Sequence, residues 1–132
     1  MEVEFLKWQR TALKGFWPDK IINQNFDVPP DRIYGGDILR VSFVGHSTVL
    51  LQIAGLNILT DPIWSARASP LSFVGPKRVL HPGIKFDDLP KIDIILVSHN
   101  HYDHMDLPTL KKIANRDNAR IIVPLGNDTI IR

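Results

Sequence analysis

The stretch that most constrains the fold of this chain is the six-residue run at 92–97. It reads Ile-Asp-Ile-Ile-Leu-Val and is almost entirely apolar and rich in β-branched side chains. Such a run is typical of a strand that is covered on both faces. Residues 120–123, Arg-Ile-Ile-Val, predict a second buried strand.

A helix is predicted between these two strands. Asp106 can cap it, and Pro108 is tolerated in a first helical turn. Leu110, Ile113 and Ala114 then fall at i, i+3 and i+4, the spacing of one helix face. Strand, helix and strand at this spacing form a crossover unit, so we predict the α/β class. A further helix is expected to begin near Asn127.

Shorter strands are predicted before this unit. Residues 39–43 alternate apolar and polar, and residues 48–53 and 57–60 follow with a turn at Ala54-Gly55 between them. Residues 62–90 contain five prolines and no sustained periodicity. A connection of that length without regular structure is commonly functional.

The first 36 residues differ from the rest. They mix aromatic and basic side chains, with a helix plausible over residues 3–14, and they end in the breakers Pro29-Pro30 and Gly35-Gly36. We therefore predict an N-terminal arm at 1–36 and a body at 37–132.

Composition narrows the functional classes. The 132 residues carry 16 basic and 14 acidic side chains, a net charge of +2, and no like-charge run that would track nucleic acid phosphates. With no cysteine, the chain has neither disulfides nor a thiolate metal site. Without a signal-like start or a membrane-length apolar run, we expect a cytoplasmic or peripheral membrane protein, not an integral one.

The chemistry is concentrated in the loop after the run at 92–97. His99, His101, Asp103 and His104 lie within six residues, and imidazole and carboxylate are natural ligands for zinc. Alternate residues of an extended loop, here His99, His101 and Asp103, can point to one side, and His104 can turn elsewhere as a helix begins. Such a loop can present His99 and His101 to one metal and Asp103 and His104 to a second. The alternative is a His-rich surface loop without metal. Four potential ligands in this order directly after a buried strand favour the metal site.

The H-x-H-x-D-H pattern resembles the principal metal motif of the metallo-β-lactamase superfamily. The resemblance implies an αββα sandwich, of which this chain holds the first αβ half, and two zinc ions in the complete enzyme. It implies that His99 and His101 bind the first zinc and that Asp103 and His104 bind the second; we also assign Asp103 a catalytic role. Asp61, in Leu-Thr-Asp-Pro, resembles an earlier aspartate of the superfamily that supports the site by hydrogen bonding. Taken alone, Asp61 would read as a turn residue.

His46 is the other candidate for a supporting residue at the edge of the site. A histidine between two strands is at least as often structural, so both readings stay open. Lys77 and Arg78 could meet phosphate, although a solvated loop tip is the simpler expectation.

A narrower resemblance covers the chain from about Trp8 onward and points to the N-acylphosphatidylethanolamine-hydrolysing phospholipase D group. It is carried by Gly45–Thr48, Ile58–Ser65, Ala68–Pro70, Phe73–Arg78, Ser98–Asp106 and Val123–Asn127. The implied substrate is a lipid phosphodiester, and the implied products are phosphatidic acid and an N-acylethanolamine. A phospholipid partner and peripheral membrane contact follow from the same resemblance.

The family pattern needs a later histidine, a bridging aspartate and a final histidine, and no histidine follows His104. We therefore expect a missing C-terminal half, or a second chain, to complete the site, and the chain alone to be inactive and to expose a sheet face. A fragment of a longer enzyme is favoured over a truncated product or a half-domain. Two rival functions stay open. One is a lactonase or sugar-phosphate esterase of the same fold, and the other is a non-catalytic metal-binding module.

Overall fold

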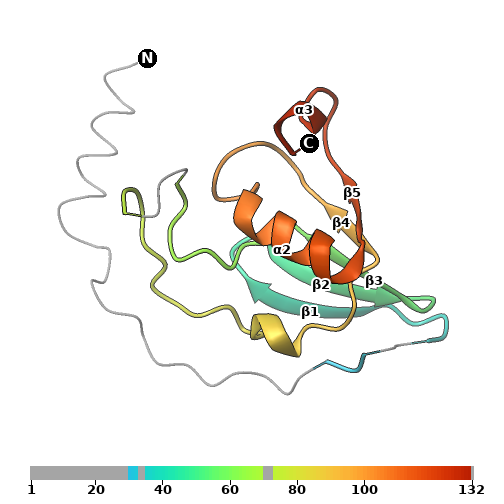
Figure 1. Ribbon diagram of the computed structural model, residues 1–132. Coiled ribbons are helices and arrows are strands. Elements are labelled where there is room, and N and C mark those ends of the chain that lie inside the picture. The colour runs from blue at the N-terminus through green and yellow to red at the C-terminus, as the bar shows by residue number, and fades with distance from the viewer. Residues whose placement is uncertain (1–29, 33–34, 70–72, 132) are drawn as a thin grey trace, which may run out of the picture.

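The computed structural model describes residues 30–32, 35–69 and 73–131. The predicted helix at 3–14 and most of the predicted arm lie outside these residues. The described part contains one five-stranded sheet with helical segments against it (Figure 1). This mixed architecture confirms the predicted α/β class.

The strands lie in the sheet in chain order. β1 (Arg40–Gly45), β2 (Thr48–Ile53) and β3 (Leu56–Thr60) form an antiparallel meander. β4 (Ile94–Leu96) runs parallel to β3, and β5 (Arg120–Ile122) runs parallel to β4. The helical segments are η1 (Phe86–Asp88), α2 (Leu107–Asp117) and α3 (Asp128–Ile131).

β4 and β5 are shorter and less covered than the sequence predicts. The ladder between them contains three residue pairs, from Ile94 opposite Arg120 to Leu96 opposite Ile122. Only Ile95 of β4 is fully buried, whereas Ile94 and Leu96 are half-buried and Ile122 is 48% exposed. Among the described residues these strands are thus covered on one face only, so the expectation of an exposed sheet face holds and the reading of 92–97 as covered on both faces is wrong. An apolar run shows that its side chains are more stable when buried, but it does not show which element buries them.

One face of the sheet holds the core. Register places Leu50, Leu59 and Ile95 side by side on this face, and each is fully buried. α2 lies across the same face (Figure 1) and contributes Leu110 and Ile113 to the cluster. Because each large apolar side chain of this kind stabilises by roughly 1.5–3 kcal/mol when buried, this face is the main source of stability.

The opposite face is apolar and open within the described residues. Phe43 is 66% exposed and Val41 58% exposed, and both belong to the row of side chains that register places on this face. The half-buried and exposed apolar members of the face are Val41, Phe43, Val49, Leu51, Ile53, Leu56, Ile58, Ile94, Leu96 and Ile122. Apolar side chains exposed next to one another in this way favour association with another surface.

The connection between β3 and β4 contains η1 as its one described helical segment, close to the sequence prediction. Side-chain hydrogen bonds nevertheless fix this connection to the rest of the fold, and Arg78 makes one of them. Arg78 is half-buried, and its Nη2 donates to the Ile63 carbonyl at 2.8 Å. Burial lowers the pKa of its guanidinium, while the charge of Asp106 opposes that shift. The expectation of a solvated tip is therefore wrong for Arg78, although Lys77 is exposed.

Within the described ranges, no helix is both long enough and apolar enough to cross a membrane.

Candidate metal centre

The candidate site lies where the parallel strands β3 and β4 end. Thr60 pairs with Leu96 in the last step of that ladder, so Asp61 and Ser98 leave the sheet next to each other. The backbone N–H of Asp61 donates to the Leu96 carbonyl at 2.8 Å. The ends of parallel strands are where ligand sites of α/β folds collect.

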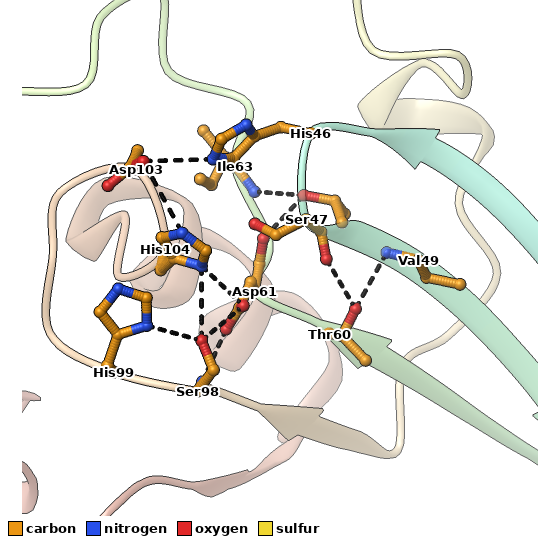
Figure 2. A network of polar contacts seen from close by, with 11 residues as sticks. His46, Ser47, Val49, Thr60, Asp61, Ile63, Ser98, His99, Asp103 and His104 are labelled. Carbon is orange, nitrogen blue, oxygen red and sulfur yellow. Dashed lines mark hydrogen bonds and ion pairs between the residues drawn. The ribbon is translucent and has the colours of Figure 1, made fainter.

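Asp61 is the buried centre of a hydrogen-bond network (Figure 2). Its Oδ1 accepts from the Ser98 backbone N–H at 2.7 Å, and its Oδ2 accepts from the Ser98 hydroxyl at 2.7 Å. His104 Nδ1 lies 2.9 Å from the same Oδ2. Burial raises the pKa of the Asp61 carboxyl, but the hydrogen bonds from His104 and Ser98 outweigh it and hold this pKa below its usual value. Asp61 is therefore a carboxylate that orients its neighbours.

These contacts decide which ring nitrogens are available to a ligand. An ionised carboxylate only accepts hydrogen bonds, so Nδ1 of His104 must carry the proton. The single hydroxyl proton of Ser98 goes to Asp61, so His99 Nδ1, 2.9 Å from Ser98 Oγ, must also donate. In the neutral tautomer, each of these histidines then keeps a free lone pair on Nε2, as a metal ligand requires.

The loop turns back on itself between these two histidines. The backbone N–H groups of His104 and Met105 both donate to the His101 carbonyl, at 2.9 and 2.7 Å. Met105 is 3% exposed and belongs to the core cluster, so it anchors the end of the turn. Asp106 follows as the cap of α2 and accepts from Thr109 N at 3.4 Å. The predicted cap at Asp106 is thus confirmed.

His46 reaches the site from the turn between β1 and β2. Its Nε2 lies 3.2 Å from Asp103 Oδ2, and its ring centroid lies 5.2 Å from that of His104. His104 Nε2 lies 3.7 Å from the same carboxylate oxygen. Figure 2 shows His46 and His104 both directed at Asp103. His46 is therefore at the site edge, and its functional role stays a prediction.

The predicted ligands do not all lie equally close to one another. Among the residues that the structure describes, the group of three metal-ligating side chains with donor atoms within 4.8 Å of one another is His46, Asp103 and His104. His99 and His101 lie beside this group, with ring centroids 4.6 Å apart, and the His99 ring lies 4.0 Å from that of His104. The assignment of His99 and His101 to one metal and of Asp103 and His104 to a second stays a prediction.

The residues present fit a divalent transition metal. Two histidines have their Nδ1 protons directed at Ser98 and Asp61, and the Asp103 side chain is 45% exposed beside them. Imidazole with carboxylate suits zinc or iron. The Asp61 carboxylate on the far nitrogen of His104 fixes its tautomer and the orientation of its ring. The orientation that a metal ligand needs is thus already set by the chain.

Ser98 is a site residue to which the sequence assigned no role. Its hydroxyl joins Asp61 to His99, at 2.7 and 2.9 Å. A serine between a buried strand and the first histidine of the motif could have indicated this role, because its short hydroxyl can reach groups on either side of it. Recognising that role also required knowing that Asp61 lies alongside.

The family model for the beta-lactamase superfamily domain matches residues 56–132, more than half of the chain. Fold and site thus define the class: the chain belongs to the metallo-β-lactamase superfamily, whose members are metal-dependent hydrolases.

Individual relatives narrow the comparison. An uncharacterized protein of Mycobacterium tuberculosis is 47% identical over 96 residues, which cover 71% of this chain and 26% of that protein. The N-acyl-phosphatidylethanolamine-hydrolyzing phospholipase D 1 of Caenorhabditis elegans is 42% identical over 101 residues, which cover 76% of this chain and 28% of that protein. The chain thus spans about a quarter of the length of these relatives.

Among solved structures, CmlA, a diiron beta-hydroxylase from Streptomyces venezuelae, is 32% identical with a TM-score of 0.45. The similar part covers 65% of this chain and 15% of that one.

Proposed function

We propose that this chain supplies the first metal-binding loop of a zinc-dependent phosphodiesterase of the phospholipase D type. Its substrate class is N-acyl phosphatidylethanolamine-like lipids. The observation that carries the proposal is the loop at the end of β4, where Asp61 and Ser98 hold His104 and His99 with their Nε2 lone pairs free. The relative of known activity from Caenorhabditis elegans supports the substrate class, since 76% of this chain aligns with it.

Within the site, the residues of the chain have separate tasks. His99, His101, Asp103 and His104 would hold the metal, and Asp61 and Ser98 orient two of the histidines through the contacts given above. When bound, zinc acts as a Lewis acid that lowers the pKa of a coordinated water to about 7 and offsets charge on phosphoryl oxygens. The remaining ligands would come from further residues of a longer protein or from a second chain. A phospholipid surface is the partner that this substrate class requires.

The metal half of the proposal is tested on the purified 132-residue chain. Elemental analysis and X-ray absorption should find zinc bound by nitrogen and oxygen donors. The matched control is the His99→Ala/His101→Ala double variant, which should lose the zinc at the position these histidines hold. Zinc that is retained and is unaffected by the double variant would contradict the assignment of His99 and His101.

The substrate half is tested by a chimera in which the matched 101 residues of the Caenorhabditis elegans enzyme are replaced by those of this chain. Release of N-acylethanolamine from lipid vesicles should be detected by mass spectrometry. The same chimera with His99→Ala/His101→Ala should lose on the order of 100-fold or more in rate, since loss of even an outer partner of a ligand costs 10–100-fold. A folded, metal-loaded chimera that cleaves a lactone or a sugar-phosphate ester but no lipid would favour the rival substrates.

A further inference from the structure

Three donor atoms from two separate segments converge at the edge of the site. Nε2 of His46 and Nε2 of His104 lie 3.2 and 3.7 Å from Oδ2 of Asp103, and one ligand atom from each of these three residues lies within 4.8 Å of the others. The H-x-H-x-D-H loop supplies two of them, and the turn between β1 and β2 supplies the third. The contact with His46 spans more than fifty residues of sequence, so it depends on the fold.

The spacing of these atoms fits one metal ion. Zinc holds nitrogen and oxygen donors at about 2.0–2.1 Å in a tetrahedron, so neighbouring donors are about 3.3 Å apart. The two distances from Asp103 Oδ2, 3.2 Å to His46 and 3.7 Å to His104, lie on either side of that value. His104 Nε2 is also the nitrogen that its contact with Asp61 leaves free.

The backbone that carries His46 is constrained by its turn. Gly45, the last residue of β1, and His46, in the two-residue turn before β2, both have positive φ, 138° and 54°. A left-handed conformation at a non-glycine residue is uncommon and costs about 1–2 kcal/mol. The turn is tied down at its far end, because the Thr48 hydroxyl donates to the Asp61 carbonyl at 2.7 Å. The same Asp61 thus fixes both the His104 ring and the segment that presents His46.

We propose that His46 is a metal ligand and closes a three-donor site with Asp103 and His104. Three protein ligands and one open position form the arrangement typical of catalytic zinc. The inference rests on the proposed function only in that a zinc-class metal binds at Asp103 and His104. It adds a ligand that the loop does not contain and that makes this position complete within the chain.

The test measures zinc and cobalt affinity of the 132-residue chain by competition with a chromophoric chelator. His46→Asn removes the imidazole and keeps a residue that tolerates positive φ. We expect at least a 100-fold loss of affinity at this position, beyond the 10–100-fold typical of residues that only support a ligand. His46→Gln places an amide nitrogen near the former Nε2, so it can restore a hydrogen bond to Asp103 but not an imidazole ligand. It should therefore bind as weakly as His46→Asn.

The His99→Ala/His101→Ala background separates the two proposals. In this background one metal should remain, with two imidazoles in its X-ray absorption spectrum, and adding His46→Asn should release it. The opposite result is that His99→Ala/His101→Ala removes all metal, whereas His46→Asn alone leaves the metal affinity of the wild-type chain unchanged. The proposed function then stands, and His46 is excluded as a ligand. If His46→Gln binds metal within a few-fold of the wild-type affinity, the proposal is also overturned, because a hydrogen bond to Asp103 is then the role of His46. A wild-type chain without metal overturns the His46 proposal, because that proposal makes this position complete within the chain. Circular dichroism of each metal-free variant verifies folding.

Discussion

At the scale of single residues, the hydrogen bonds of Asp61 link the fold to the site. Asp61→Asn keeps the size and the tolerance of the positive φ of 35° at this position but removes the charge and one acceptor. Three donated hydrogen bonds converge on the carboxylate. We expect the substitution to lower the free energy of unfolding of the metal-free chain by about 1–3 kcal/mol at neutral pH, measured by urea denaturation.

The same variant makes a prediction about pH. Because the pKa of Asp61 is lowered in the folded chain, its contribution is fully present above the unfolded-state value, about 3.9. It is lost as pH falls through the lower folded value. The stability difference between the wild type and Asp61→Asn should therefore shrink at acid pH. A difference that grows towards acid pH would mean that the carboxyl is neutral in the folded chain.

Ser98 gives a second prediction at this scale. Ser98→Ala removes the hydroxyl that lies between Asp61 and His99 and frees the His99 ring to turn. Metal affinity should fall about 10–100-fold, as is typical when a partner that orients a ligand is lost. Ser98→Thr keeps the hydroxyl and is the matched control. Equal affinities of the alanine and threonine variants would show that the hydroxyl does not orient His99.

At the scale of elements, Asp106 joins α2 to the long connection after β3. Its carboxylate accepts from the backbone N–H groups of Trp64 and Ser65 at 3.2 and 2.9 Å and from the hydroxyl of Thr109 at 2.6 Å. Asp106→Ala should cost about 2–3 kcal/mol of unfolding free energy, because a lost cap alone costs 0.5–2 and the freed donors lie in a part-buried site. The exposed Asp87 of η1 is the control, and Asp87→Ala should stay within about 0.5 kcal/mol. Similar losses in both variants would argue against a joining role for Asp106.

Elements were predictable where local signals agree with the tertiary environment. The meander of β1 to β3 and the cap at Asp106 follow from alternation and capping chemistry, and both are confirmed. The length of β4 was not predictable. Its apolar run extends over 92–97, but the ladder needs a partner at each step and pairs only Ile94–Leu96. Strand ends are thus set by neighbours that are distant in sequence.

At the scale of the whole molecule, the site combines one local motif with contacts made by the fold. The four residues of the H-x-H-x-D-H loop could be found from the sequence, because metal ligands with short spacing leave a local pattern. His46 against Asp103 could not, since that contact depends on the register of β1 with β2 and on the pairing of β3 with β4. The contact between His46 and Asp103 is therefore a product of the fold and leaves no local pattern in the sequence.

The open apolar face of the sheet leads to a prediction for the molecule as a whole. Phe43 and Val41 are 66% and 58% exposed on this face, and an apolar surface in water favours association. The 132-residue chain should therefore bind a hydrophobic dye and sediment as more than a monomer at high concentration. Phe43→Lys/Val41→Lys should lower both signals several-fold, with little change in the thermal midpoint because these side chains are already exposed.

The control for this experiment is Leu125→Lys, which alters a fully exposed leucine between β5 and α3, outside the sheet. Its dye binding and sedimentation should match those of the wild type, because a single exposed leucine forms no patch. If Leu125→Lys abolishes association and the double lysine variant does not, the sheet face is not the contact surface. If instead the face drives association, its apolar rows require a covering layer, and a layer placed there extends along the strands whose ends carry Asp61 and Ser98.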